Sequence, residues 1–197
     1  MTDFSIVKKN LEDLGYSVQV FATGDEAASY LDSVIDGKSV GIGGSGTVQS
    51  ICVYDMLVKH NTVYWHWKQD ADTARKNAMD TDIYLSSVNA LAKTGEMVNI
   101  DGVGNRVAST LYGHKKVYYL IGRNKLTETY EDAIWRARNV AAPQRAQQLN
   151  RKTPCAVNAD RCYNCKSPER VCRCLVTLWG PTCMEAEVIL IDEDLGL

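Results

Sequence analysis

The chain of 197 residues has few prolines, no long apolar run and no strong excess of charge. With only four prolines and no low-complexity tract, long disordered segments are not expected. A hydrophobic content of 45% and a charged content of 23% are those of an ordinary globular domain. The formal net charge of -2 by itself indicates neither a nucleic-acid nor a membrane partner.

Targeting signals are also absent from the sequence. No stretch approaches the roughly 18 apolar residues of a membrane span, and residues 1–5 lack the basic start of a signal peptide. We therefore expect a cytoplasmic protein without a membrane partner. In that compartment, seven cysteines favour metal or redox chemistry over a disulfide framework. Whether the chain forms a homo-oligomer stays open.

Apolar periodicity divides the chain into alternating strands and helices. This alternation predicts a three-layer α/β fold, with a mostly parallel sheet and helices on both faces. One domain should cover residues 1–197, with a Cys-rich insertion over 154–183 and a hairpin strand near 97–100. Pro143 is expected to interrupt the last long helix. The strands are expected near residues 16–21, 39–42, 62–65, 82–88, 116–122 and 186–191, and the helices near 3–14, 25–35, 51–57, 69–79, 105–112 and 128–148.

A glycine-rich loop, residues 41–47, joins an expected strand to an expected helix. Ligands of open α/β sheets bind at such strand ends. Glycines permit positive φ and close backbone approach, and the free N–H groups of a helix start favour an anion. The alternative is a tight turn without a ligand, and the pattern matches neither a P-loop nor a dinucleotide fingerprint. The predicted anion-binding residues here are Gly43, Gly44, Ser45, Gly46 and Thr47.

Residues 89–106 gather polar side chains around three glycines, directly after an expected buried strand. Asp101 or Glu96 could act as a general acid or base, and Arg106 could pair with a carboxylate or phosphate. Turn chemistry without further function is the alternative. Lys125, after the next strand, should reach the same sheet edge. The predicted ligand-binding residues of this group are Asn89, Asn99, Asn105, Arg106 and Lys125.

Residues 82–106 and 116–125 resemble the LUD family, the lactate-utilisation group also called DUF162. More distantly they resemble the superfamily of isomerases, CoA transferases and initiation factor 2B (NagB/RpiA/CoA transferase-like). That superfamily holds a phosphate on a Gly-Ser-Gly-Thr loop beside a second loop that is acidic or contains Asn-Gly. In this chain, residues 44–47 correspond to the first loop and residues 99–105 to the second. The resemblance covers nearly the whole chain and implies the fold and a context of lactate utilisation. It defines no reaction.

The cysteines cluster in the last quarter of the chain. Cys162 and Cys165 form a C-x-x-C pair, and Cys155 and Cys172 could complete a tetrahedral set for Zn²⁺ or an iron–sulfur cluster. Cys174 could replace Cys172, and free or redox-active thiols are the alternative. The ferredoxin spacing of cysteines is absent. Cys52 lies in an apolar helical pattern and is expected to be a core thiol.

Basic residues are concentrated between Arg136 and Arg173, where nine Lys/Arg stand against two Asp/Glu. Such a segment could steer an anion or a nucleic acid, or form a solvated basic surface. Tyr163 is the lone aromatic residue among its loops, which argues against stacking of single-stranded nucleic acid.

Two functions follow from these features. The first is a protein that binds a phosphate- or carboxylate-bearing metabolite, either an enzyme or a subunit of a lactate oxidation system. The second is a non-enzymatic, metal-carrying subunit that docks iron–sulfur redox proteins. The sequence does not decide whether the chain is an enzyme.

Overall fold

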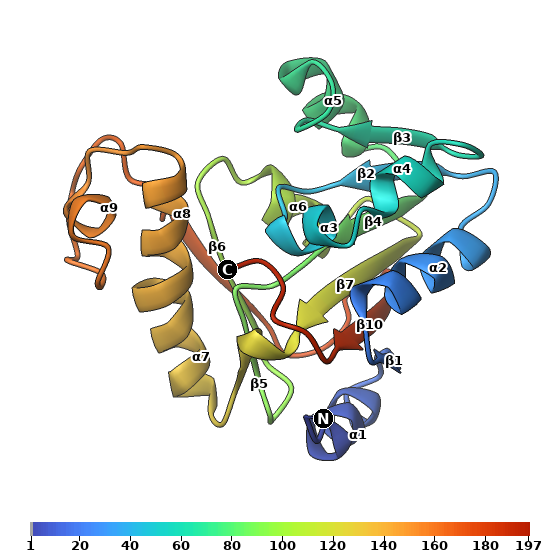
Figure 1. Cartoon of the computed structure of the whole chain (residues 1–197), viewed down its shortest axis with the longest axis horizontal. Coiled ribbons are helices and arrows are strands. Elements are labelled where there is room, and N and C mark those ends of the chain that lie inside the picture. Colours follow the sequence, from blue (N-terminus) through green and yellow to red (C-terminus); the bar gives the residue numbers. More distant parts are fainter. Residues whose placement is uncertain (1) are drawn as a thin grey trace.

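The main sheet of this computed structural model, which describes residues 2–197, has six parallel strands (Figure 1). The predicted α/β fold with a mostly parallel sheet is confirmed. The last strand lies between the first strand and the long seventh strand, so the two ends of the chain meet in one sheet. In spatial order the strands are β1 (Ser17–Phe21), β10 (Glu185–Ile191), β7 (Lys116–Gly122), β4 (Ile83–Ser86), β2 (Ser39–Ile42) and β3 (Thr62–Trp65).

Two neighbouring interior strands of the main sheet, β7 and β10, are apolar on both faces. Val117–Gly122 of β7 and Val188–Ile191 of β10 are buried along their whole length. A parallel strand covered on both faces needs such a continuous apolar run, because each pleat meets a packed layer. This is why periodicity located these strands well.

Helices cover both faces of the main sheet. The helices α2 (Gly24–Val34), α3 (Gly46–Ser50) and α4 (Val53–Leu57) pack on one face. The helices α1 (Ser5–Asp13), α5 (Ala71–Ala78) and α6 (Asn105–Leu111) lie toward the opposite face. Within residues 2–197, no helix combines the length and the hydropathy that a membrane crossing needs.

A second, four-stranded sheet packs beside the main one. Only the hairpin of β5 (Ala90–Ala92) and β6 (Met97–Asp101) was expected from the sequence. β9 (Cys174–Leu178), which follows the Cys-rich loop, pairs antiparallel with β6, and α7 (Tyr130–Arg136) covers the outer face. In spatial order the strands are β8 (Leu126–Thr127), β5 (Ala90–Ala92), β6 (Met97–Asp101) and β9 (Cys174–Leu178).

The helix from Tyr130 to Gln148 is not broken at Pro143. It passes from α7 through a π-helical segment, η2 (Ala137–Ala141), into α8 (Ala142–Gln148). Proline at the start of α8 lacks the N–H that a regular helix would direct four residues back. The wider π turn before it absorbs this misfit, so the axis continues.

The helix after the glycine loop differs more from expectation. α3 and α4 are separate because Cys52 between them has φ 54°, the left-handed conformation. This break turns Cys52 to the surface, so its predicted core position is wrong. The Cys-rich segment contains the short helix α9 (Pro154–Asn158) beside α8 and otherwise lacks regular structure up to β9.

Candidate functional site

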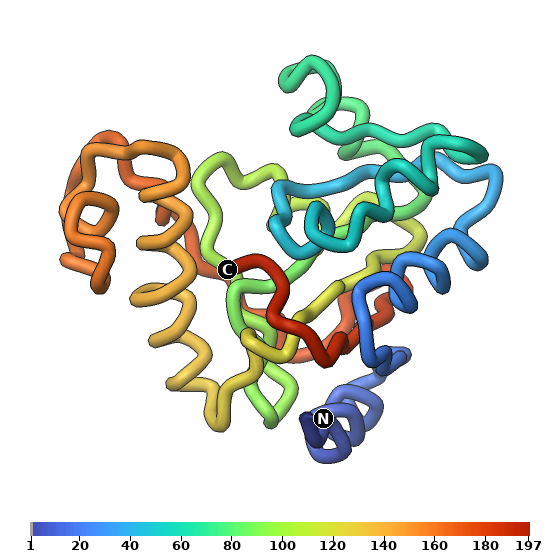
Figure 2. Tube along the Cα trace, viewed as in Figure 1, coloured from blue at the N-terminus to red at the C-terminus, as the bar shows by residue number. Residues whose placement is uncertain are grey.

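A cavity of about 810 Å³ opens between the main sheet and the C-terminal half of the chain. The glycine loop, the end of β6 and the start of α6 form one side, and α8 with residues 168–173 forms the other. Residues 196 and 197 also line the cavity, and the C-terminus of the trace lies between the glycine loop and α8 (Figure 2). The cavity is strongly basic, since its lining residues include seven Lys or Arg and two Asp or Glu. These are Arg75, Arg106, Lys125, Arg145, Arg151, Arg170, Arg173, Asp101 and Glu169.

The glycine loop contributes Gly44, Ser45 and Gly46 to the cavity wall. None of its glycines has positive φ. Close approach explains the glycine at 43 instead, because an added Cβ would lie 2.8 Å from the Tyr84 hydroxyl. The Ser45 hydroxyl caps α3 by accepting the Val48 N–H at 3.2 Å. Gly43 and Thr47 lie behind the wall and do not line the cavity.

Lys125 reaches the cavity from η1 (Arg123–Lys125), directly after β7. Its side chain is only 4% exposed. The Nζ atom donates to the Thr47 hydroxyl at 2.7 Å and to the Ser87 hydroxyl at 2.9 Å. Burial, with Arg136 and Arg106 nearby, holds the pKa of Lys125 well below its usual range.

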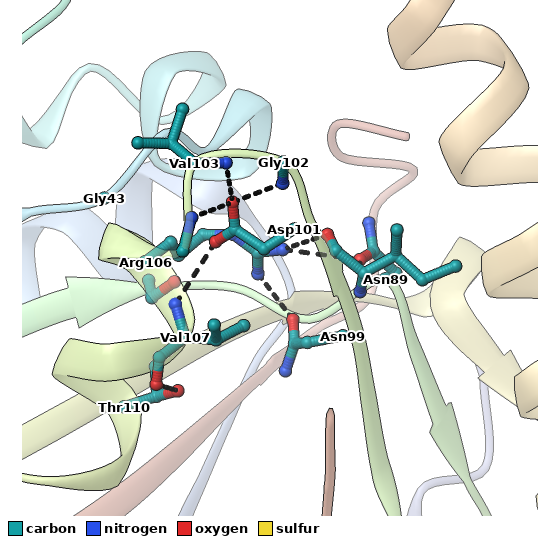
Figure 3. A network of polar contacts seen from close by, with 12 residues as sticks. Gly43, Asn89, Asn99, Asp101, Gly102, Val103, Arg106, Val107 and Thr110 are labelled. Carbon is teal, nitrogen blue, oxygen red and sulfur yellow. Dashed lines mark hydrogen bonds and ion pairs between the residues drawn. The ribbon is translucent and has the colours of Figure 1, made fainter. Parts of the chain in front are cut away.

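Asp101 organises the loop that follows β6 (Figure 3). Its Oδ1 atom accepts the N–H groups of residues 102, 103 and 104 at 2.6, 3.1 and 3.1 Å. Its Oδ2 atom accepts the Val107 N–H in the first turn of α6 at 3.2 Å. A carboxylate with both oxygens engaged by backbone donors shapes a loop. This geometry favours a structural role over the proton transfer that the sequence led us to expect.

Arg106 is a clamp within the protein rather than a free anion-binding group. Its guanidinium donates to the carbonyls of Ser87 at 3.0 Å and Ile100 at 2.8 Å. It also donates to the side-chain oxygens of Asn99 and Asn89, and its Nε lies 3.8 Å from the carboxylate of Asp101. The fork therefore ties β4, β6 and α6 together (Figure 3). Asn89 and Asn105 still line the cavity, whereas Asn99 is buried beneath it.

Glu96 lies apart from the cavity. It is in the β5–β6 turn, at the opposite end of β6 from Asp101, and its carboxylate accepts from the Thr94 hydroxyl. The neighbouring Gly95 lies against Leu14, the residue that follows α1. The structure thus separates the two carboxylates that the sequence grouped as candidate acid and base.

The arginines opposite the glycine loop were not singled out from the sequence. Four of them belong to the basic stretch 136–173, whose charge was the available signal. Within residues 2–197, Arg145, Arg151, Arg170 and Arg173 form no ion pair with Asp or Glu. The buried Nε of Arg170, like that of Arg75, has no hydrogen-bond acceptor among the described residues.

Two aromatic side chains complete the wall beside the glycine loop. His66 and Trp67 line the cavity after β3. The Arg145 guanidinium carbon lies 5.0 Å from the centre of the Trp67 ring, a cation–π contact. Burial, followed by the charges of Arg75 and Arg145, lowers the pKa of His66.

The cysteine segment borders the cavity through Arg170. The Arg170 guanidinium donates to the Cys172 sulfur at 3.3 Å, and the Asn164 N–H lies 3.4 Å from the Cys162 sulfur. Cys155 instead contacts the Thr153 hydroxyl. Among residues 2–197, no three His, Cys, Asp or Glu side chains are arranged to hold a metal ion. The predicted set of Cys155, Cys162, Cys165 and Cys172 is thus not assembled here.

Comparison with known proteins places the chain in a family. Its fold is similar to a crystal structure of a DUF162 family protein from Deinococcus radiodurans at 1.70 Å resolution. The TM-score is 0.52 at 10% sequence identity, and the match covers 97% of this chain and 99% of that one. No curated protein matches the chain. Residues 5–191 match the LUD domain, so the chain belongs to the LUD domain family, which is associated with lactate utilisation.

Proposed function

We propose that the chain binds an anionic metabolite with at least two negatively charged groups in the basic cavity. The observation that carries this proposal is the set of cavity arginines without carboxylate partners. Both lining acids are already engaged, Asp101 by backbone N–H groups and Glu169 by the N–H of Lys152 at 3.0 Å. Guanidinium groups pair best with carboxylates and phosphates, so an anionic ligand would complete their hydrogen bonding.

The size of the cavity favours a ligand larger than lactate. A volume of about 810 Å³ falls in the range of sites for cofactor-sized or drug-sized molecules. The cations also lie on two separate sides, near the glycine loop and along residues 145–173. A ligand with a carboxylate at one end and a phosphate at the other would satisfy both sides. The lactate-utilisation context of the family is compatible with a carboxylate.

The proposal concerns binding and names no reaction. Asp101 is occupied by backbone donors, and Glu96 lies outside the cavity. Neither carboxylate therefore supports acid–base chemistry on a bound ligand.

Titration calorimetry with 3-phosphoglycerate and, separately, with lactate tests the proposal. We expect saturable binding that is tighter for the phosphorylated acid and weakens with added salt. Arg151→Gln and Arg170→Gln should each weaken binding about tenfold, as expected for a charged hydrogen bond of roughly 1.5 kcal/mol. Arg123→Gln, an arginine outside the cavity, is the matched control. The proposal is refuted if neither acid binds saturably, or if Arg123→Gln weakens binding as much as the cavity variants do.

The cysteine segment supports a second candidate, the metal-carrying function. The specific observation is the contact between the Asn164 N–H and the Cys162 sulfur, because an N–H directed at a cysteine sulfur would also stabilise a metal-bound thiolate. Elemental analysis of anaerobically purified protein tests it. Stoichiometric zinc or iron that is lost in Cys162→Ser and Cys165→Ser, but kept in Cys52→Ser, would support it. Metal-free wild-type protein would reject it.

A further inference from the structure

We propose that Lys125 is a nucleophile that forms an imine with the carbonyl carbon of an anionic 2-oxo acid. This inference rests on the anion-binding function proposed for the cavity. It assigns a chemical class to the ligand, an acid with a ketone or aldehyde carbonyl within reach of Nζ, and a covalent step to a residue that anion binding alone does not explain.

Hydrogen bonding around Lys125 uses two of the three positions on Nζ that can carry a proton or a lone pair, and leaves the third unused. The Thr47 hydroxyl donates its proton to the Leu195 carbonyl at 3.0 Å, so its oxygen accepts from Lys125. The Ser87 hydroxyl points to the Val88 carbonyl at 3.5 Å and likewise accepts from Lys125. Two N–H bonds are thus committed. The remaining position of Nζ holds a third proton in an ammonium ion or the lone pair in an amine.

The electrostatic surroundings favour the amine. Lys125 is 4% exposed and makes no ion pair within residues 2–197. The nearby charged groups that act on it, Arg136 and Arg106, are both cations. Removing an ammonium from water without a counter-ion is costly, so this environment favours the uncharged amine over the ammonium. An amine lone pair in a ligand cavity is what nucleophilic attack on a carbonyl requires.

The step balances without an external reagent. The Nζ lone pair attacks the carbonyl carbon, a C–N bond forms, and the π electrons pass to the oxygen. A proton moves from Nζ to that oxygen, giving a carbinolamine. Loss of water then yields the imine, with no change in oxidation state. The cavity arginines would hold the acid group of the substrate during this sequence. Because its bond to Val88 is long, the Ser87 hydroxyl can turn and donate to the imine nitrogen.

Reductive trapping tests the inference on the full chain. The protein is incubated with pyruvate and sodium cyanoborohydride, digested and analysed by peptide mass spectrometry. An imine at Lys125 leaves a 1-carboxyethyl group on that residue. At about pH 7.5 an ordinary lysine is roughly 0.1% uncharged. The uncharged fraction rises about tenfold for each unit by which a lysine pKa falls, so Lys125 should label at least tenfold faster than the exposed Lys115, the internal control.

We expect labelling of Lys125 to saturate with pyruvate, to fall in the presence of 3-phosphoglycerate, and to vanish in Lys125→Met. Lys115→Arg should leave it unchanged. Equal labelling of Lys125 and Lys115, or none at Lys125, overturns the imine proposal. If anions still bind by calorimetry in that case, the proposed function stands without it, and if they do not, both fail. Should Lys125→Met not fold, the peptide map of the wild type decides alone.

Discussion

Replacing Arg106 with lysine should destabilise the protein strongly, although the charge is kept. The guanidinium makes four hydrogen bonds to partly or fully buried acceptors, and its side chain is 11% exposed. An ammonium cannot reproduce the planar fork that spans the Ser87 carbonyl and the Asn99 side chain on one nitrogen and Ile100 on the other. At least two acceptors would lose their donor, at roughly 1.5 kcal/mol each. The expected loss is about 3 kcal/mol in the free energy of unfolding.

Urea unfolding followed by circular dichroism measures this loss, and thermal unfolding provides a second reading. For a domain of this size, about 3 kcal/mol corresponds to a fall in Tm of roughly 6–12 °C. Arg123→Lys is the matched control, because Arg123 also has several polar partners, two of them carboxylates, but is 44% exposed. Its effect should stay below about 1 kcal/mol. If Arg106→Lys costs no more than Arg123→Lys, the assignment of Arg106 as an internal clamp is wrong.

Three further predictions concern the same region. Asp101→Asn should cost about 1 kcal/mol in urea unfolding, because an amide oxygen still accepts the loop N–H groups while the Val107 N–H loses its acceptor. Asp101→Ala should cost at least about 2 kcal/mol, and equal costs would contradict the structural role. Gly43→Ala should cost roughly 1–3 kcal/mol by overpacking against Tyr84, while Gly180→Ala, whose Cβ meets no atom closer than 3.7 Å, serves as control in the same assay. A bound anion would neutralise part of the positive charge of Arg75 and Arg145, so it should raise the lowered pKa of His66. The affinity for the anion should then increase as the pH falls through the His66 pKa of the complex, and it should level off below the His66 pKa of the free protein. Calorimetry in two buffers should detect proton uptake that His66→Gln removes, and identical uptake in both proteins would exclude the linkage.

The main sheet was predictable because its strands are recognisable from their own apolar residues, without reference to the rest of the chain. β7 and β10 read as continuous apolar runs, since both faces are covered. β9 was missed although four of its five residues are apolar, because it is short, follows the irregular Cys-rich segment directly, and has no alternation of apolar and polar residues to mark a strand. The break at Cys52 has no glycine or proline to mark it, so only tertiary packing explains it.

The candidate site was predictable only where residues follow parallel strands. The glycine loop, Asn89 and Lys125 were found because the ends of parallel strands meet at one edge. The identity of a residue does not reveal how its hydrogen-bonding capacity is used, which is why Asp101 was read as an acid or base and Arg106 as a ligand-binding group. The cationic wall was visible only as a charge excess, because Arg145 and Arg170 approach the loop solely through the folding of distant segments.

The contact between β6 and β9 explains how the two sides of the cavity are held in register. Asp101 pairs with Cys174 in the second sheet, and the Asp101 carbonyl also accepts the Arg173 N–H at 2.9 Å. The same residue therefore shapes the loop at the end of β6 and anchors the arginine segment that faces it. Arg173 in turn donates to the Pro168 carbonyl at 2.8 Å, which fixes the turn that carries Arg170. The cysteine-rich segment thus has a role in placing cations even without a metal, and a ligand that bridges the two sides would stabilise a contact the fold already provides.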